Sequence, residues 1–266
     1  MKTTLLIATY NWPEALRVCI KSVFHQSELP AEIVIADDGS DVETRKMVEK
    51  LRRISPVPII HIWHPDNGFR KTIILNKAVR ESSGDYIIQV DGDVILHPRF
   101  IEDHLQYAEK GFFIKGGRAL LNKRKSEKFL RKGALPPQKI NLFDTTNRFN
   151  SFRCSLLSML FCRCTENYLS VRGCNMAYWK EDYIKVNGYN NDITGWGYED
   201  RDLAVRLHNS GLKMKCLKFK AIEYHLHHDY KSREDGDRNF EISTNAINKD
   251  EIECKNGYCQ THAITN

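Results

Sequence analysis

The 266-residue sequence has no apolar run that approaches the roughly 18 to 20 uninterrupted residues needed to span a bilayer. The sequence therefore excludes a membrane-crossing helix. Paired cysteine spacings of the zinc-binding kind are also absent, although the chain contains eight cysteines. Because the sequence opens with a strand-like segment rather than a cleavable signal, we expect these cysteines to be reduced thiols in a cytoplasmic protein.

A strong excess of one charge sign is lacking as well. The 40 Lys and Arg residues exceed the 34 Asp and Glu residues by a formal charge of +6. Such a mild bias suits nucleic acid, anionic lipid or a phosphorylated ligand equally, so it selects none of them. With 41% hydrophobic and 10% aromatic residues, the chain can bury a full core in one large α/β domain or two small ones.

Strands and helices alternate along the first 90 residues. Their order predicts a mostly parallel sheet flanked by helices, in which ligands bind at the carboxyl ends of the strands. The expected strands are Thr4 to Ala8, Ile33 to Ala36, Ile59 to Trp63 and Tyr86 to Val90, and the expected helices are Trp12 to Phe24, Asp41 to Arg53 and Thr72 to Glu81.

Polar residues follow each of these strands. The last pair, Asp91 and Asp93, can turn both carboxylates toward one hard cation, and Gly92 between them lets the backbone approach a ligand closely. A turn or a helix cap explains each polar strand end taken alone. Their joint position favours a ligand site. The four strand ends are Thr9-Tyr10-Asn11, Asp37-Asp38-Gly39-Ser40, Asp66-Asn67-Gly68 and Asp91-Gly92-Asp93.

A second acidic segment, Gly195 to Asp202, precedes an amphipathic helix expected over Leu203 to Leu207. Carboxylates at a helix start are favoured by the helix dipole, so N-terminal capping is one interpretation. The other is a sugar site. Trp196, flanked by glycines, can cover the apolar face of a sugar ring while Glu199 and Asp200 accept hydrogen bonds from its hydroxyl groups.

Three histidines lie within Tyr224 to His228. A neutral imidazole can complete an oxygen-rich Mn²⁺ site, and we expect His225 to do so, with His228 as the alternative ligand. A surface cluster of histidines without a ligand remains possible. A zinc-only site is disfavoured, because no cysteine pair accompanies the histidines.

The first 120 residues resemble the nucleotide-sugar half of family 2 glycosyltransferases, which have the single-domain, Rossmann-like GT-A fold with a mixed, mostly parallel sheet. The resemblance is carried by the four strand ends and by Asn76. It implies that Thr9 and Tyr10 line a base pocket, that Asp38 contacts uridine and that Asp91 faces the ribose or the metal. Asp93 would bind Mn²⁺ or Mg²⁺ at the diphosphate of a UDP-sugar.

One departure from this family concerns the residue before Asn76. Many relatives have Arg there, whereas this chain has Leu75. Arg70 and Lys71 are the cations that can replace it. The complete nucleotide-sugar set implied by the resemblance is Thr9, Tyr10, Asp38, Asn67, Arg70, Lys71, Asn76, Asp91 and Gly92.

The second acidic segment resembles the Gly-Trp-Gly-Gly-Glu-Asp acceptor motif of GT-A enzymes of the β4-galactosyltransferase and chondroitin-polymerase type. The resemblance implies that Trp196, Gly197 and Glu199 hold the acceptor and that Asp200 is the catalytic base. It also implies a metal ligand among the histidines, at His225. Tyr198 replaces the second Gly of the motif, which would narrow the acceptor site.

The segment from Asn122 to Tyr168 is strongly basic, with ten Lys or Arg against three acidic residues. Within it, Phe152 to Phe161 could form an amphipathic helix at the inner face of a membrane, and the acceptor would then be a lipid-linked glycan. The alternative is a helix packed on the sheet beside a solvated basic loop. The expected organisation is a nucleotide-sugar half (1–120), a variable basic segment (121–168), an acceptor and catalytic half (169–235) and a tail (236–266) in which Ile242 to Asn266 is docked or frayed.

These features together predict an inverting, metal-dependent glycosyltransferase that moves a sugar from a UDP-sugar to a carbohydrate or glycolipid acceptor in glycan synthesis. A haloacid-dehalogenase-type phosphatase also uses Asp-x-Asp after a strand, but the order of its motifs along the chain is the reverse of the order here. A non-catalytic basic binding module would leave Trp196 to Asp200 without a role. Nucleic acid is not expected as a partner, because the basic segment lacks regularly interleaved aromatic residues.

Overall fold

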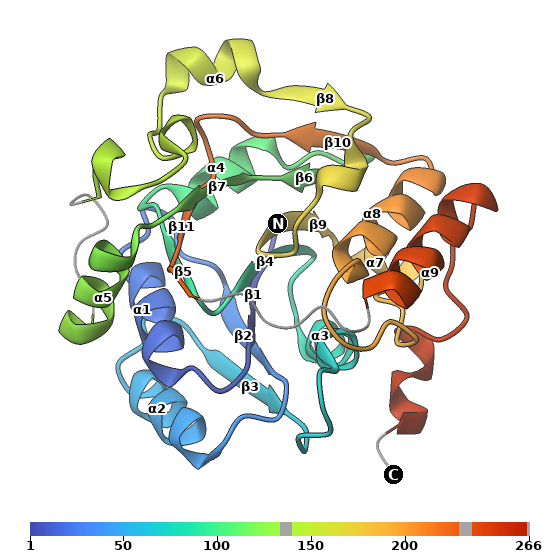
Figure 1. The fold of residues 1–266 in the computed structure, drawn as a ribbon, viewed down its shortest axis with the longest axis horizontal. Helices are drawn as coiled ribbons and strands as arrows, with labels where there is room; N and C mark the ends of the chain where they lie inside the picture. Colours follow the sequence, from blue (N-terminus) through green and yellow to red (C-terminus); the bar gives the residue numbers. More distant parts are fainter. Residues whose placement is uncertain (134–139, 229–235, 265–266) are drawn as a thin grey trace.

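The computed structural model of the chain describes residues 1–133, 140–228 and 236–264 (Figure 1). Strands and helices alternate strictly as far as β4. The first elements are β1 (Thr3–Thr9), α1 (Pro13–Val23), β2 (Glu32–Asp37), α2 (Val42–Arg52), β3 (Ile59–Trp63), α3 (Lys71–Glu81), β4 (Tyr86–Asp91), β5 (Val94–Leu96), α4 (Phe100–Tyr107), β6 (Phe112–Lys115), β7 (Gly117–Leu120) and α5 (Lys123–Lys132). The later elements are α6 (Ser155–Phe161), β8 (Arg163–Thr165), β9 (Asn175–Trp179), α7 (Lys180–Lys185), α8 (Glu199–Asn209), β10 (Lys213–Cys216), β11 (Ile222–His225) and α9 (Gly236–Asn248), with short 3₁₀ turns between them.

The main sheet has eight strands in the order β3-β2-β1-β4-β9-β6-β10-β8. The strands β3, β2, β1 and β4 are parallel to one another. Next, β9 runs antiparallel between β4 and β6, β10 is parallel to β6, and β8 closes the edge as an antiparallel strand. This arrangement confirms the predicted α/β fold with a mixed, mostly parallel sheet flanked by helices.

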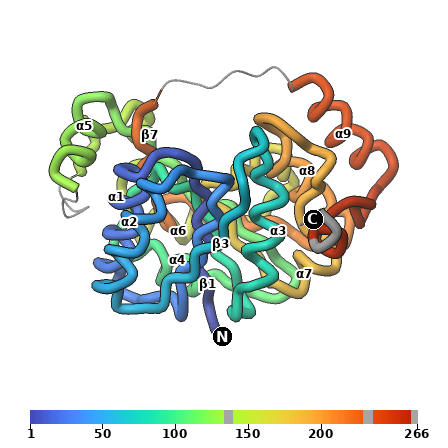
Figure 2. Tube along the Cα trace, turned by 90° about the horizontal axis from the view of Figure 1, so that it is seen from below, coloured from blue at the N-terminus to red at the C-terminus, as the bar shows by residue number. Residues whose placement is uncertain are grey.

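Both faces of the sheet are covered because alternate residues of each strand point to opposite sides. In β1, Leu5 and Ile7 pack against α1 and α2, whereas Leu6 and Ala8 face α3. Figure 2 shows α1 and α2 on one side of the strands and α3, α7 and α8 on the other. The parallel strands are therefore mostly apolar on both faces, which is the pattern that predicted them.

A second, three-stranded sheet in the order β5-β11-β7 was not anticipated. Its strands have only three or four residues each, too short for a clear period in the sequence. β5 and β11 are antiparallel, with His225 opposite Val94. This pairing places the histidine segment beside Asp93, which immediately precedes β5, although the two lie more than 130 positions apart.

The predicted helices and strands of the first 90 residues are confirmed within one or two residues. Asp41 caps α2 by accepting hydrogen bonds from the backbone amides of Glu43 and Thr44. The helix expected over Phe152 to Phe161 is shorter than predicted, because Arg153 binds the buried carboxylate of Asp103 and Phe152 packs on Phe219. The helix therefore begins only at Ser155.

The described part of the tail is docked on the loop before α8 and on the end of α8. A docked tail was one of the two predicted alternatives. Asn209 at the end of α8 donates hydrogen bonds to the carbonyl groups of Ala246 and Glu251. Asn187 and Asn191 similarly bind the backbone of the tail near Gly257. Within the described ranges, no helix is both long and apolar enough to cross a bilayer. All eight cysteines are described and free of disulfide bonds.

Candidate active site

Lys71 joins the two acidic segments that the sequence singled out. It opens α3, and its Nζ lies 3.0 Å from Asp91 Oδ1 at the end of β4 and 3.6 Å from Glu199 Oε1 at the start of α8. Burial disfavours the charged ammonium group, but the charges of Asp91, Asp200 and Glu199 outweigh it and hold the pKa of Lys71 well above its usual range. The residues predicted to bind the nucleotide sugar and the residues predicted to bind the acceptor therefore meet at one charged cluster.

The two aspartates of the Asp91-Gly92-Asp93 turn lie in opposite electrostatic environments. Burial raises the pKa of Asp91, helped by the nearby charges of Asp93 and Asp200 and opposed by Lys71. Burial also acts on Asp93, but a hydrogen bond from His228 and the charge of His225 outweigh it, so the pKa of Asp93 is lowered. The two histidines therefore favour the ionised form of Asp93.

Asp93, His225 and His228 form a group whose ligand atoms all lie within 4.8 Å of one another. The Nε2 atom of His225 is 3.5 Å from Asp93 Oδ1, and that of His228 is 3.2 Å from Asp93 Oδ2. His227 is outside the group: it is exposed and its backbone amide binds Ser126. Both histidines that were considered as ligands thus reach the predicted position.

The chemistry of this group fits a divalent cation. His225 Nδ1 must donate its proton to the carbonyl oxygen of Leu226, at 2.9 Å, because that oxygen can only accept. In the neutral imidazole the Nε2 lone pair then faces Asp93 Oδ1, a buried atom that has no hydrogen-bond partner among the described residues. Two facing acceptors need a positive centre between them, and a carboxylate with two imidazoles is a ligand set that Mn²⁺ accepts.

The first turn of α8 directs its three acidic residues to different partners. Glu199 faces Lys71, and its burial, together with the neighbouring charge of Asp200, raises its pKa to about 7 despite that lysine. Asp202, with only 1% of its surface exposed, forms an ion pair with the fully buried Arg206. Arg206 also donates to the carbonyl groups of Val186 and Gly188. Asp202 therefore anchors the loop before α8 and is not available to a substrate.

Asp200 is fixed through both of its carboxylate oxygens. Oδ1 accepts a hydrogen bond from the Tyr189 hydroxyl at 3.0 Å, and Oδ2 accepts one from the Gly173 amide at 2.6 Å. A Cβ atom on residue 173 would lie 2.2 Å from Asp200 Oδ1, so only glycine allows this approach. Burial raises the pKa of Tyr189 well above its usual range, which keeps the hydroxyl protonated as a donor.

Gln89, in the middle of β4, orients both of these donors. Its Nε2 donates to the Tyr189 hydroxyl at 2.7 Å and to the Gly173 carbonyl at 3.2 Å, and its Oε1 accepts from Tyr178. Because Tyr189 already accepts from Gln89, its own proton is directed to Asp200. Gln89, Gly173 and Tyr189 lie outside the motifs that predicted the site. A glutamine inside an otherwise apolar strand was the available signal, since buried amides require partners.

The residues predicted to bind the nucleotide line the carboxyl ends of β1 to β3. Tyr10 is partly exposed and donates to Asp66, Thr9 is nearly buried, and Asn67 is exposed in the loop after β3. Asp38 is buried, and its two carboxylate oxygens bind His64 Nε2 and the backbone amide of Arg70. In this conformation Asp38 therefore shapes the loop that carries Arg70.

Two of the predicted nucleotide-sugar residues belong to the framework. Asn76 is fully buried, donates to the Tyr189 carbonyl and to Asn191, and accepts from the Tyr189 amide. Gly92 donates to the Ala8 carbonyl at 2.7 Å, and a Cβ there would come within 3.1 Å of Ala8 and Thr9. The close approach that Gly92 permits is thus to β1, and Asn76 positions the loop before α8.

Two of the predicted acceptor residues, Trp196 and Gly197, lie at the surface just before α8 and form the rim of the site. Trp196 has 38% of its surface exposed, and Gly197 has a φ of +106° with open space around it. Tyr198 adopts a left-handed conformation, and its ring packs on Phe240 of α9 at 5.4 Å between centroids. The tail therefore contributes to the wall beside this rim.

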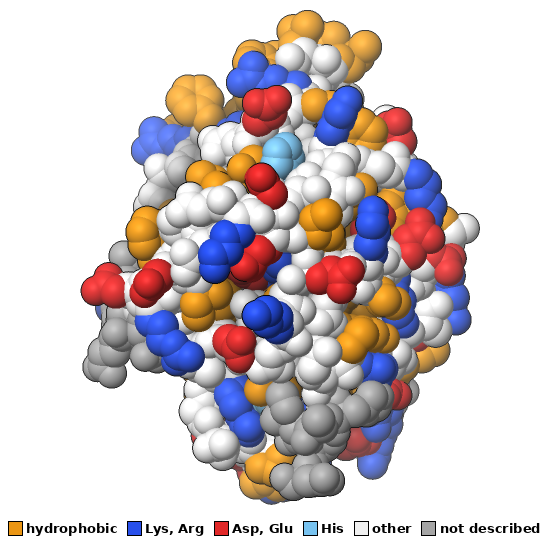
Figure 3. All heavy atoms as spheres, turned by 90° about the vertical axis from the view of Figure 1, so that its right-hand side faces the viewer, with side chains coloured by type: hydrophobic (Ala, Val, Ile, Leu, Met, Phe, Trp, Pro, Cys, Tyr) orange, Lys and Arg blue, Asp and Glu red, His pale blue; other side chains and the backbone are white. Residues whose placement is uncertain are grey.

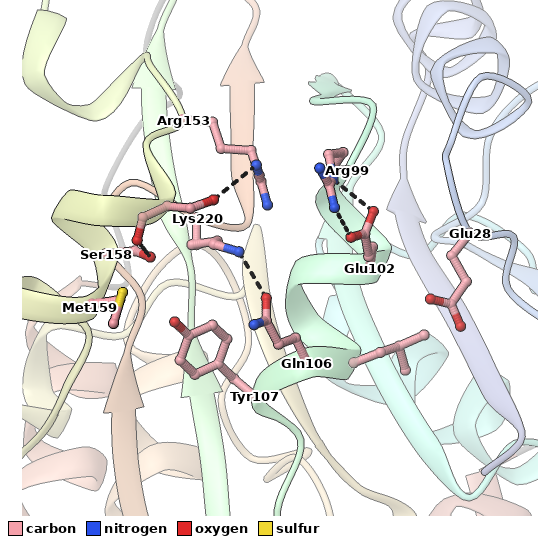
Figure 4. A pocket seen from close by; sticks show the side chains of 11 residues that line it. Glu28, Arg99, Glu102, Gln106, Tyr107, Arg153, Ser158, Met159 and Lys220 are labelled. Carbon is pink, nitrogen blue, oxygen red and sulfur yellow. Dashed lines mark hydrogen bonds and ion pairs between the residues drawn. The ribbon is translucent and has the colours of Figure 1, made fainter.

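A cavity of about 570 Å³ lies elsewhere, between α4 and α6 (Figure 4). It contains none of the residues predicted for the site. Its cations are already paired, because Arg99 binds Glu102 while Arg153 and Lys220 bind Asp103. The charges in and around this cavity balance, which gives it no evident preference for an anionic donor.

Two family models match the sequence. The model described as glycosyl transferase family 2 covers residues 4–168, and the one described as the N-terminal domain of galactosyltransferase covers residues 155–229. The first covers more than half of the chain and includes both aspartates of the Asp91-Gly92-Asp93 turn. The second includes the first turn of α8 and the histidine segment.

Curated relatives of known name match most of this chain. Chondroitin synthase of Escherichia coli is 20% identical over 240 residues, which is 84% of this chain and 34% of that protein. Validoxylamine A glucosyltransferase of Streptomyces hygroscopicus subsp. limoneus is 25% identical over 223 residues, 79% of this chain and 49% of that protein. The chain thus spans between a third and a half of the length of these relatives.

Solved structures share the fold. TarS 1–349 of S. aureus in complex with UDP has a TM-score of 0.64 and 16% identity, over 98% of this chain and 68% of that chain. The mannosyltransferase PcManGT of Pyrobaculum calidifontis, in complex with GDP-Man and Mn²⁺, has a TM-score of 0.57 and 15% identity, over 85% of this chain and 56% of that chain.

Proposed function

This chain belongs to glycosyl transferase family 2, and we propose that it transfers a sugar from a UDP-sugar to a hydroxyl group of a carbohydrate acceptor, with inversion at the anomeric carbon. One observation carries the proposal. The cation-binding group of Asp93, His225 and His228 and the fixed carboxylate of Asp200 belong to one site, linked through Asp91, Lys71 and Glu199.

The donor end of the site is formed by the turn after β4 and the histidines of β11. Asp93, His225 and His228 would hold Mn²⁺ or Mg²⁺, which when bound neutralises charge on the departing diphosphate. Thr9, Tyr10 and Asn67 at the strand ends would contact the nucleotide. Arg70 and Lys71 would add positive charge between the nucleotide and Asp91.

The acceptor end is formed by the first turn of α8. Asp200 would remove the proton from the attacking hydroxyl as the bond from the anomeric carbon to the diphosphate breaks. A single displacement of this kind inverts the anomeric centre. Tyr189 and Gly173 hold the Asp200 carboxylate in one orientation, which favours attack along one line. Trp196 would cover a sugar face, and Glu199 would bind an acceptor hydroxyl.

Calorimetric titration with UDP tests the donor end. Wild-type protein should bind UDP with Mn²⁺ present and much more weakly without it, and Asp93→Asn should abolish the difference. His225→Ala and His228→Ala should each weaken the metal-dependent part. His227→Ala is the matched control, because His227 lies outside the group. GDP serves as the competing nucleotide, since the structural neighbours include one complex with UDP and one with GDP-Man.

Turnover is followed as UDP released from a panel of UDP-sugars, with and without carbohydrate acceptors. Release that requires an acceptor supports transfer, and the anomeric configuration of the product, read by NMR, reports inversion or retention. UDP affinity that is the same with and without metal, in both wild type and Asp93→Asn, would contradict the metal assignment. Phosphate release without any acceptor would instead indicate a phosphatase.

A further inference from the structure

Helix α6 presents an apolar face to solvent. The exposed fractions of its side chains are 73% for Leu156, 78% for Met159, 74% for Leu160 and 51% for Phe161. We refer to these four residues as the apolar tip. Scattered apolar side chains are common on protein surfaces, but four on one seven-residue helix form a contiguous feature that is typical of an interaction site.

The apolar tip is held in place by the structure beneath it. Phe161 and, just before α6, Phe152 pack on Phe219, with ring centroids 5.6 and 5.0 Å apart. Ser158, on the inner side of the helix, is buried, and its carbonyl accepts the amide of Cys162. The exposed side chains therefore extend from an anchored helix.

Two exposed cations lie beside the apolar tip. Arg163 and Lys218 are exposed, and neither forms an ion pair with a described acidic residue. Lys218 lies beside α6, because its carbonyl group contacts the Cys162 thiol at 3.3 Å. The acidic residues in positions 140–168 are Asp144, which is paired with Lys125, and Glu166, which is exposed. Figure 3 shows apolar atoms at the top of the molecule, with both basic and acidic side chains below them.

The strand register places α6 on the same edge of the sheet as the site. Gln89 lies opposite Met176, Met176 opposite Lys115, Lys115 opposite Cys216, and Cys216 opposite Arg163. Arg163, two residues after α6, is thus in one row with Gln89, two residues before Asp91. Four strand spacings of about 4.8 Å separate the two, or roughly 19 Å.

We propose that the apolar tip inserts into the surface of an anionic lipid bilayer, with Arg163 and Lys218 contacting the headgroups. The charges of Arg163 and Lys218 favour an anionic bilayer as the partner of the apolar tip, because cations that lack acidic partners attract an anionic surface. An active site roughly 19 Å along the same edge would then lie close to the bilayer. Resting on the proposed function, we infer that the acceptor is a glycan carried by a lipid.

Sedimentation with vesicles tests the docking surface without any catalytic step. Wild-type protein should sediment with vesicles that contain about one third phosphatidylglycerol and much less with phosphatidylcholine alone, and high salt should release it. Replacing Leu156, Met159 and Leu160 by Gln should weaken partitioning by about 10-fold or more. Arg163→Gln with Lys218→Gln should reduce the preference for anionic vesicles. All of these positions are exposed, so the fold should be retained.

Matched controls use the opposite end of the sheet. Ile54→Gln removes an apolar side chain that is 64% exposed, and Lys50→Gln with Arg53→Gln removes two exposed cations of the α2 region. These variants should partition like the wild type.

Wild-type protein that stays in the supernatant with both vesicle types would overturn the proposal. So would a wild-type dimer in analytical ultracentrifugation that becomes monomeric in the triple Gln variant, because the apolar tip would then be a contact between copies.

The titration with UDP is independent of lipid. Normal metal-dependent UDP binding with no vesicle binding would reject the docking surface and leave the proposed function standing. Vesicle binding without any UDP binding would do the reverse. If both hold, transfer to a lipid-linked oligosaccharide should be faster on anionic vesicles than in detergent, and the triple Gln variant should lose that stimulation.

Discussion

Two acidic segments of this chain meet at one site but differ in how their carboxylates are arranged. Asp91 and Asp93 follow a strand, and both stay at the site, one facing Lys71 and the other the histidines. Glu199, Asp200 and Asp202 open a helix, where successive residues are turned by about 100°. That rotation sends Asp202 into the core, to Arg206. Identical residue types thus acquire different roles from the geometry of the element that carries them.

The difference also separates binding from chemistry. The strand-end pair lies beside two histidines, which suits a cation, whereas Asp200 contacts a tyrosine hydroxyl and a backbone amide. Substitutions in the first segment should therefore act on donor affinity. Those in the second should act on turnover, on folding or on acceptor binding, depending on the residue.

The largest effect on turnover is expected for Asp200→Asn. Asparagine keeps the shape but cannot accept a proton from the acceptor, so kcat should fall by about 10²- to 10⁴-fold. UDP affinity with Mn²⁺ should be unchanged, as measured by calorimetry. Glu199→Gln, in contrast, should mainly raise the acceptor KM, because binding common to ground and transition states is lost. Near-normal kcat in Asp200→Asn at saturating substrates would place the base elsewhere.

Asp202→Asn should lower stability rather than turnover. The substitution leaves the fully buried Arg206 without its counter-charge, which costs about 3–5 kcal/mol of the free energy of unfolding. The thermal midpoint should drop by about 6–15 °C. The kcat of the remaining folded protein should stay close to that of wild type. A stable variant with strongly reduced kcat would mean that Asp202 contributes to the reaction directly.

Tyr189→Phe removes one of the two hydrogen bonds to Asp200. Losing a bond to a charged group costs about 1.5–3 kcal/mol, so kcat should fall by about 10- to 100-fold with little change in either KM. Tyr178→Phe, two hydrogen bonds further from Asp200, is the matched control and should have a smaller effect. Equal effects on kcat would reject the positioning role.

The first half of the fold was predictable because its strands are buried on both faces. Such strands are continuous apolar runs that end in polar residues, and helices with clear periodicity separate them. The histidines beside Asp93 were harder to place, since a three-residue strand pairing brings His225 to Asp93 across more than 130 positions. No local pattern encodes such a pairing. The sequence offered His228 only as the alternative to His225, whereas the structure places both histidines beside Asp93.

The same limit applies to residues that act through hydrogen bonds. Asn76 carries a family motif, yet it is buried and positions the loop before α8. Tyr189 lies in that loop, and Gly173 is in an unremarkable segment of the chain. Their roles depend on the hydrogen bonds that join them to Gln89 of β4 and Asp200 of α8, which motif spacing does not reveal. Helix α6 was predicted as amphipathic, but only the structure identifies which of its side chains face solvent.

The smallest effect expected is a pH-dependent difference in stability at Glu199. Its pKa in the folded protein is about 7, above the ordinary value of 4.5, because the carboxyl group is buried beside Asp200. Between these two values the folded state holds a proton that the unfolded state has released, so this residue makes the protein less stable as pH rises. Glu199→Gln cannot titrate. Its thermal midpoint relative to wild type should therefore increase from about pH 5 to about pH 8. Glu14→Gln, at an exposed glutamate of α1, should show a constant difference over the same range. If the difference in thermal midpoint between Glu199→Gln and wild type is also constant with pH, Lys71 keeps Glu199 ionised. The two acidic segments would then differ only in the geometry of their carboxylates.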